Sequence, residues 1–350
     1  MKELVIKGKN IGKKHLPFII AEMSGNHNHS LERALAIVDA AAKTGVHALN
    51  IQTYTADTMT LNLSRGEFFI KDKKSLWKGT SLYELYKQAA TPWEWHKPIF
   101  ERCKKLGLIG FSTPFDATAV DFLEELDVPC YKIASFELVD LPLIKKAAAT
   151  GKPLIISTGM ATKKEIGEAV GTAKAAGCRQ LVLLKCTSSY PASPDDSNLA
   201  TIPDLKKRFQ CLSGLSDHTL GIGAAVASVA LGANVIEKHF TLSRKEGGVD
   251  SAFSMEPQEM KQLVEEIKRA WESLGKVKYG PTKEEKKSLV FRRSLYIVKD
   301  IKKGDVFTKD NIKSIRPGYG LAPKYYEKIL GEKVNIDMKK GTAITWGIVK

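Results

Sequence analysis

Cysteine is scarce in this chain, and long apolar runs are absent. The five cysteines among 350 residues are odd in number and form no Cys-x-x-Cys pair, which argues against a disulfide framework and a zinc knuckle. No stretch reaches the roughly 18 apolar residues that a membrane-spanning helix requires, and the opening MKELVIKGKNIGKKH contains no apolar signal core. These absences predict a cytoplasmic protein without a membrane partner.

Acidic residues are also fewer than basic ones. The chain has 54 basic and 39 acidic residues, a formal net charge of +15, and 17 basic against 8 acidic residues lie between positions 281 and 350. Such a tail is either a lysine-rich solvated surface or a surface for an anionic partner such as nucleic acid. No RNA-binding or zinc-finger motif is present, so we expect no nucleic-acid partner. The patterns GxGxxG and GxxxxGK[ST] are missing as well, which argues against a nucleotide cofactor.

Short β-branched runs alternate with amphipathic helical patterns from residue 17 to about residue 240, which is typical of a parallel sheet. The helical stretches begin at N-caps such as Ser30 and Thr162 and end at Gly45 and Gly177. Eight strands are expected, at 17–23, 48–54, 110–115, 130–135, 153–159, 181–187, 211–218 and 233–240. Eight strands with intervening helices predict an α/β fold, the (β/α)8 or TIM barrel.

A separate module follows the barrel. After a helical pattern that ends near residue 274, the stretch GKVKYGPTKEEKKS is polar and marked by glycine and proline. We therefore expect a barrel at 1–278, a linker at 279–289 and a small β-rich domain at 290–350. Within the barrel, the segment 55–91 is too long for an ordinary βα loop. Its aromatic residues Trp77, Tyr83 and Tyr86 predict that it folds over the site.

Polar residues mark the carboxyl ends of all eight expected strands. In a TIM barrel these ends meet at one mouth, where active sites lie. Helix capping explains single serines but not lysines and histidines, so the pattern favours an active site. The residues singled out at these ends are Glu22, Asn26, Asn50, Gln52, Thr113, Lys132, Ser135, Glu137, Ser157, Ser188, Ser216, His218 and His239.

Two of these residues form a candidate metal pair. His218 and His239 lie at equivalent depths on the seventh and eighth strands, so their imidazoles should be close together. Each histidine alone is more simply interpreted as a hydrogen-bonded core residue. The pair, with Glu22, Asp250 and water nearby, suits Mn²⁺, Mg²⁺, Co²⁺ or Zn²⁺ as a Lewis acid that polarises a carbonyl.

Lys132 and the serines of neighbouring strands predict a site for an anion. One ammonium with several hydroxyl donors suits a phosphate or a carboxylate. The alternative is that the serines only cap the helices that follow them. After the eighth strand, the loop RKEGGVDSAFSMEP carries Asp250 and is either a flexible connection or a substrate contact. Its position over the mouth favours substrate contact.

These residues stand in an order that resembles a known family. The endings AEMSGNHN, QTY, FSTPFD, YKIASFE, ISTGMAT, CTSSYP, GLSDHTLG and VIEKHFTL, followed by RRSLY and RPGYG, are similar to those of the N-acetylneuraminate synthase-like sugar-acid synthases. The similarity spans nearly the whole chain. So many motifs in the same order make the resemblance specific.

The resemblance implies a metal-dependent transferase that condenses phosphoenolpyruvate with the open-chain aldehyde of an N-acetylated amino sugar and releases phosphate. It implies that His218 and His239 hold the metal, with Mn²⁺ first and Mg²⁺ or Co²⁺ as alternatives, and that Glu22, Lys132 and Asp250 are catalytic. The tail resembles the SAF, or antifreeze-like, domain, which implies a domain-swapped homodimer. The implied substrate contacts are Asn26, Asn50, Gln52, Thr113, Ser135, Glu137, Ser157, Ser188, Ser216 and, in the tail, Arg316.

Three segments, SLYELYKQAATPWEWH, GGVDSAFSMEP and RPGYGLAPKYY, are similar to the branch whose sugar is 2,4-diacetamido-2,4,6-trideoxy-L-altrose. The alternatives are a synthase for N-acetylneuraminic or legionaminic acid that uses another amino sugar, and a non-catalytic carbohydrate-binding protein. One departure bears on activity. The family has a lysine where this chain has Asn50, which removes a cation expected to hold phosphoenolpyruvate unless another lysine, such as Lys185, compensates. Milder departures are Ser188 and Val249.

Overall fold

The computed structural model describes residues 3–73 and 75–350. The chain forms two compact units, Met1–Gly275 and Lys276–Lys350. Among the described residues, no helix combines the length and the apolar character needed to cross a membrane.

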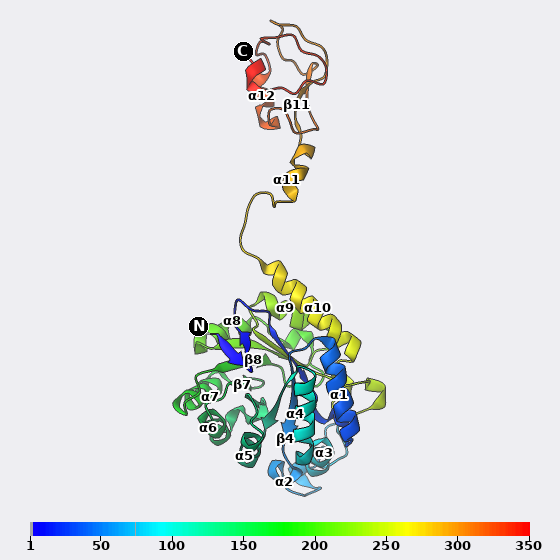
Figure 1. The fold of residues 1–350 in the computed structure, drawn as a ribbon, viewed down its shortest axis with the longest axis vertical. Helices are drawn as coiled ribbons and strands as arrows, with labels where there is room; N and C mark the ends of the chain where they lie inside the picture. The colour runs from blue at the N-terminus through cyan, green and yellow to red at the C-terminus, as the bar shows by residue number, and fades with distance from the viewer. Residues whose placement is uncertain (1–2, 74) are drawn as a thin grey trace. The chain divides into compact units, whose positions relative to one another are not determined.

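Eight parallel strands close into a barrel in the first unit, in the order β10-β3-β4-β5-β6-β7-β8-β9 (Figure 1). The barrel closes between its first and last strands, where His239 pairs with Glu22. This arrangement confirms the predicted (β/α)8 fold, with a strand at each expected place. The barrel strands are β3 (Phe18–Glu22), β4 (Ala48–Thr53), β5 (Ile109–Pro114), β6 (Tyr131–Ile133), β7 (Leu154–Ser157), β8 (Leu181–Cys186), β9 (Leu212–Asp217) and β10 (Val235–His239).

Helices follow the strands and surround the barrel (Figure 1). The predicted caps are present: the Ser30 side chain accepts a hydrogen bond from the backbone N–H of Arg33, and Thr162 forms a capping box with Glu165. The helices of this layer are α1 (Leu31–Thr44), α4 (His96–Lys105), α5 (Ala117–Glu125), α6 (Leu141–Ala149), α7 (Lys163–Ala175), α8 (Thr201–Phe209), α9 (Gly223–Ala230) and α10 (Pro257–Leu274).

Successive side chains of a strand point to opposite faces of the sheet, so each barrel strand sends alternate side chains into the barrel interior and toward the helix layer. On β3, Phe18 and Ile20 belong to an apolar cluster inside the barrel, whereas Ile19 and Ala21 pack with the outer helices. Glu22, two residues after Ile20, lies on the same inward face of β3 and lines a cavity at the mouth. The interior is therefore apolar at one end and polar at the carboxyl ends of the strands.

A short hairpin precedes the barrel, and the sequence did not predict it. Its strands β1 (Leu4–Ile6) and β2 (Lys9–Ile11) pair antiparallel. Leu4, Ile6 and Ile11 join the apolar interior cluster that also holds Phe18. The hairpin thus buries the apolar end of the barrel and leaves the polar end for the site.

The long segment after β4 folds into two short helices, α2 (Ala56–Met59) and α3 (Leu82–Ala89). The indole Nε1 of Trp77 donates a hydrogen bond of 2.9 Å to the backbone oxygen of Val249, in the loop after β10. Trp77 and Tyr86 line the cavity at the mouth, as predicted, whereas Tyr83 donates a hydrogen bond to Asp57 instead. The segment therefore forms one wall of the site.

The second unit contains a small antiparallel sheet of β11 (Ser294–Ile297) and β12 (Ile312–Ile315). Leu295, Phe307 and Ile344 belong to its own apolar core. Two one-turn helices, α11 (Glu285–Ser288) and α12 (Tyr326–Ile329), complete it. Arg316 follows β12 directly and is exposed.

Candidate active site

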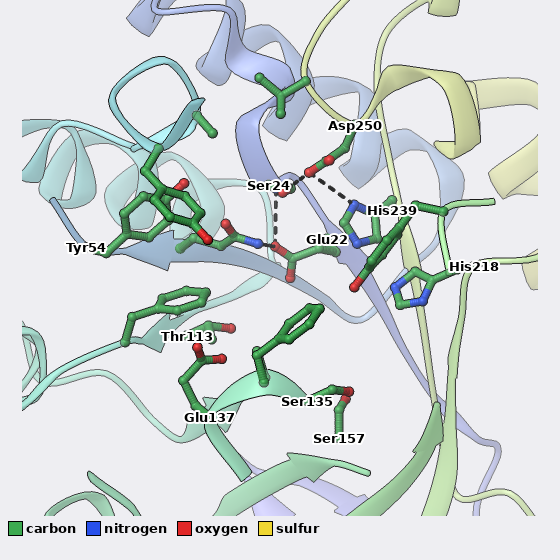
Figure 2. Close-up of a pocket in the computed structure, with 18 of the residues that line it drawn as sticks. Glu22, Ser24, Tyr54, Thr113, Ser135, Glu137, Ser157, His218, His239 and Asp250 are labelled. Atoms are coloured by element: carbon green, nitrogen blue, oxygen red, sulfur yellow. Dashed lines mark hydrogen bonds and ion pairs between the residues drawn. The ribbon is translucent and has the colours of Figure 1, made fainter. Parts of the chain in front are cut away.

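The carboxyl ends of the barrel strands surround a cavity of about 450 Å³, shown in Figure 2. Polar side chains come from the strand ends and from the loop after β10. The predicted site residues that line the cavity are Glu22, Gln52, Thr113, Lys132, Ser135, Glu137, Ser157, Ser216, His218, His239 and Asp250. The ends of seven barrel strands and the loop after β10 supply these residues, and the closed barrel brings them together.

A buried ion pair lies at the floor of the cavity. The Nζ of Lys132 on β6 is 2.8 Å from Oε1 of Glu237 on β10, and the hydroxyl of Ser216 donates to the same oxygen at 3.1 Å. Burial by itself lowers the pKa of Lys132, but the attraction and hydrogen bond of Glu237 outweigh it and raise the pKa above its ordinary value. Lys132 is therefore a cation at neutral pH.

Asn50 lies next to this pair and is fully buried outside the cavity lining. Its amide Nδ2 donates to a carboxylate oxygen of Glu22, to Oγ1 of Thr113 at 3.0 Å and to Oε2 of Glu237 at 3.5 Å. The amide thus separates two carboxylates that would otherwise face each other directly.

Glu22 accepts further hydrogen bonds from the backbone N–H of Ser24 at 3.2 Å and from Gln52 at 3.3 Å. Burial and the neighbouring Glu237 raise its pKa well above the ordinary value, and Lys132 only partly offsets them. Ser24 also donates its hydroxyl to Asp250, whose pKa is raised by burial. Figure 2 shows this chain of contacts from Glu22 through Ser24 to Asp250.

The two predicted metal ligands lie side by side, with ring centroids 5.2 Å apart (Figure 2). Nδ1 of His218 is 2.9 Å from the backbone oxygen of Thr187, which orients this ring. Nδ1 of His239 is buried without a hydrogen-bond partner among the described residues and is 3.8 Å from a carboxylate oxygen of Asp250. Burial lowers the pKa of His239 well below its ordinary value, so this ring is neutral at pH 7.

Within residues 3–73 and 75–350, no three His, Cys, Asp or Glu side chains come close enough together to hold a metal ion by themselves. The unpartnered nitrogen of His239 and the oriented ring of His218 nevertheless fit a two-imidazole site whose other ligands are water or substrate. The donor set is compatible with a divalent cation, and it does not select one metal.

Of the predicted anion site, Lys132 and three of the four serines, Ser135, Ser157 and Ser216, line the cavity, whereas Ser188 does not. The Ser157 hydroxyl is buried without a partner among the described residues, whereas the Ser135 hydroxyl accepts from the backbone N–H of Gly159 at 3.1 Å. Ser216 donates to Glu237. An unsatisfied buried hydroxyl costs free energy, so Ser157 in particular suits a site completed by a ligand.

Glu137 contributes a carboxyl that titrates near neutral pH. Burial raises its pKa to about 7, and its Oε2 has no hydrogen-bond partner in the described part of the chain. It lines the cavity close to Thr113 and Ser135, where a bound ligand could contact this carboxyl (Figure 2).

The remaining predicted residues lie outside the cavity lining. Asn26 is buried behind it and donates to the backbone oxygen of Phe240 and to Ser254, which holds the loop after β10 in place. Ser188 lies next to Cys186 and not in the lining. The ammonium of Lys185 donates to the backbone oxygen of Cys186 at 2.7 Å, so it does not enter the cavity to replace the missing lysine.

Several lining residues were not among the predicted site residues. The sequence could have predicted Glu237, because Val235, Glu237 and His239 are alternate residues of β10 and therefore share its inward face. The apolar and aromatic lining had no such signal, since it depends on how the segment after β4 folds back. The additional lining includes Ser24, Tyr54, Met59, Ile70, Leu82, Leu85, Phe115, Cys186, Tyr190 and Val249.

Known proteins resemble this chain in sequence and structure. It is 46% identical to the pseudaminic acid synthase of Campylobacter jejuni serotype O:2, over 94% of this chain and 96% of the relative. It is 44% identical to the pseudaminic acid synthase of Helicobacter pylori, over 94% and 96%. The crystal structure of N-acetylneuraminic acid synthetase from Leptospira borgpetersenii, in complex with citrate, matches with a TM-score of 0.73 and 33% identity, over 82% of this chain and 95% of that one.

Two family profiles match the two parts of the chain. The SAF domain profile matches residues 292–349, and the NeuB family profile matches residues 37–279. The barrel, the polar mouth and these matches agree, and the chain belongs to the NeuB family.

Proposed function

We propose that this chain makes pseudaminic acid by condensing phosphoenolpyruvate with 2,4-diacetamido-2,4,6-trideoxy-L-altrose. The observation that carries the proposal is the single cavity in which Lys132, three serine hydroxyls and the imidazoles of His218 and His239 line the mouth of a NeuB-family barrel. The 44–46% identity to two pseudaminic acid synthases favours this sugar over the substrates of other family branches.

Phosphoenolpyruvate would bind at the anion site. An ammonium has three donors, and Glu237 is the only described residue that accepts a hydrogen bond from that of Lys132, so two donors would serve the phosphate or carboxylate of the substrate. Ser135, Ser157 and Ser216 would add neutral hydrogen bonds. In our proposal the three-carbon substrate lies on the side of the cavity formed by β6, β7 and β9.

A divalent metal, Mn²⁺ in our proposal, would be held by His218 and His239. When bound, it would polarise the aldehyde oxygen of the sugar and make the carbonyl carbon more electrophilic. Asp250, 3.8 Å from the ring of His239, would accept hydrogen bonds from the sugar. Gln52, Thr113 and Glu137 would contact the sugar from the other side.

The proposed condensation requires proton transfers, and we propose that Glu22 carries them out. C3 of phosphoenolpyruvate forms a bond to the aldehyde carbon, and the aldehyde oxygen takes up a proton. Water then adds at C2 and loses a proton, and the C2–O bond to phosphate breaks. Burial and the neighbouring Glu237 raise the pKa of Glu22 well above its ordinary value, which favours a bound proton, so Glu22 would supply the first proton and recover one from the water. Asn50 keeps Glu22 and Glu237 in position.

We also propose a cytoplasmic homodimer in which the second unit of one copy, with Arg316, covers the cavity of another. Phe136 lines the cavity and is 56% exposed, which leaves apolar surface for a covering element. Mixing a Lys132→Met variant with an Arg316→Ala variant tests this: a swapped dimer restores one intact site per mixed dimer. Two inactive variants that stay inactive when refolded together would contradict the swap.

The overall activity is tested by incubating the purified chain with phosphoenolpyruvate, Mn²⁺ and each candidate sugar. We expect phosphate release with the altrose derivative and a nine-carbon keto acid identified by mass and stereochemistry. Phosphate release only with the sugar precursor of N-acetylneuraminic or legionaminic acid would replace our choice by that branch. Binding of sugar without phosphate release would favour a non-catalytic protein.

A further inference from the structure

The cavity has one side that the proposed chemistry does not use. Part of its lining is apolar and comes from the segment after β4 and from Phe115, which packs against Tyr54; Figure 2 shows Tyr54 across the cavity from His218. We call this surface the apolar wall, and it consists of Met59, Ile70, Leu82, Leu85 and Phe115.

Two tyrosines stand beside the apolar wall. The ring of Tyr54 packs edge-on against Phe115, with centroids 5.0 Å apart, and against Tyr86, at 6.1 Å. Both tyrosines line the cavity, and neither hydroxyl forms a hydrogen bond with any described residue. These hydroxyls are therefore free to bond to a ligand.

Two other polar side chains near the wall already have hydrogen-bond partners. Gln52 donates to Glu22, and the Ser75 hydroxyl accepts a hydrogen bond from the backbone N–H of Trp77 at 3.2 Å. The hydrogen bond from Trp77 to Val249 ties the segment to the loop after β10. A ligand group placed here meets a fixed apolar surface with two tyrosine hydroxyls as polar contacts.

We infer that the apolar wall, with Tyr54 and Tyr86, selects a 6-deoxy sugar that carries an acetamido group at C4. The inference rests on the proposed function, because it concerns the sugar of that reaction. The methyl group at C6 and the acetyl methyl have no polar atoms to satisfy, so they bury well against the wall. The acetamido carbonyl accepts a hydrogen bond from a free tyrosine hydroxyl.

A hydroxyl in place of a hydrogen at C6 would lose water where it packs against the wall, because the five apolar side chains offer it no strong hydrogen-bond partner. Apolar pockets reject an added hydroxyl by at most about 100-fold. We therefore expect a preference of roughly 10-fold to 100-fold in kcat/KM, which corresponds to about 1.4–2.8 kcal/mol in the transition state.

The test uses two sugars that differ by one oxygen: 2,4-diacetamido-2,4,6-trideoxy-L-altrose and the same sugar with a hydroxyl at C6. The wild-type chain should prefer the 6-deoxy sugar. Met59→Gln and Leu82→Gln, at two half-buried positions of the wall, should lower the ratio of kcat/KM values at least threefold, because the amide offers the hydroxyl a partner. Leu126→Gln, at a half-buried position outside the cavity, should leave the ratio unchanged.

Tyr54→Phe and Tyr86→Phe test the polar part with a sugar that has a hydroxyl instead of the acetamido group at C4. At least one of them should reduce the preference for the 4-acetamido sugar while the C6 preference stays. Equal kcat/KM for the C6 pair in the wild-type chain would overturn the inference without any variant. Unchanged ratios in both folded glutamine variants would overturn it as well. Failure of the wild-type chain to convert either sugar would instead contradict the proposed function.

Discussion

The ammonium nitrogen of Lys132 lies 2.8 Å from a carboxylate oxygen of Glu237, and both side chains are buried at the floor of the cavity. Lys132, the cation expected to hold phosphoenolpyruvate, thus already forms an ion pair with Glu237 in the protein without substrate. Glu237 keeps Lys132 charged and in place, and the amide of Asn50 and the hydroxyl of Ser216 support Glu237 from behind.

Lys132→Met should abolish phosphoenolpyruvate binding and lower the free energy of unfolding by about 3–5 kcal/mol, because it leaves Glu237 buried without its cation. Urea unfolding and isothermal titration with phosphoenolpyruvate measure the two effects. The double variant Lys132→Met/Glu237→Gln should recover much of the stability and none of the binding. Normal phosphoenolpyruvate binding by Lys132→Met would contradict the assignment of this lysine.

Asn50→Ala should lower the free energy of unfolding by about 1–3 kcal/mol, because two buried carboxylates lose a shared donor. Asn50→Asp has nearly the same shape but adds a third carboxyl between Glu22 and Glu237, so its cost should be larger. Thermal unfolding at pH 7 compares the two variants. If Asn50→Asp is as stable as the wild-type chain, the amide does not separate the carboxylates as the structure indicates.

Removal of divalent metal with a chelator should abolish turnover, and Mn²⁺ should restore it. His218→Ala should lose Mn²⁺ in equilibrium dialysis and reduce activity by at least about 100-fold. The control is His47→Ala, because His47 is a second partly buried histidine whose ring accepts a hydrogen bond from the backbone of Ile19 and does not line the cavity. Mn²⁺ binding that survives in His218→Ala would place the metal elsewhere.

Glu137 should make stability depend on pH. Because its pKa is about 7 in the folded chain, against about 4.3 in an unfolded one, the folded state retains this proton to higher pH. Between these values the unfolded state binds fewer protons, so the free energy of unfolding falls as pH rises, by at most about 1.4 kcal/mol per pH unit. Glu137→Gln should flatten the profile between pH 4.5 and 7 in urea unfolding.

The control for Glu137 is Glu125→Gln, which alters an exposed carboxyl at the end of α5. It should leave the slope of the stability profile unchanged. The same slope in Glu137→Gln and the wild-type chain would show that this carboxyl has an ordinary pKa in the folded protein.

The sequence by itself determined the barrel and most of its polar mouth. Local patterns were sufficient because strand alternation sets which side chains point inward: Phe18 and Ile20 predict the inward phase that ends in Glu22. The same periodicity places His239 on the inner face of β10. The face to which a side chain points follows from its position along one strand, so it can be predicted without knowing the contacts between distant residues.

Only the tertiary structure decided which of these groups pair and what closes the cavity. Lys132 and Glu237 are 105 residues apart, and Asn50 meets Glu237 across 187 residues, so strand order and barrel closure create these contacts. The apolar wall depends on how the segment after β4 folds back and on its hydrogen bond to Val249. Contacts between residues so far apart in the sequence leave no local pattern from which they could be predicted, because the closed barrel brings these residues together.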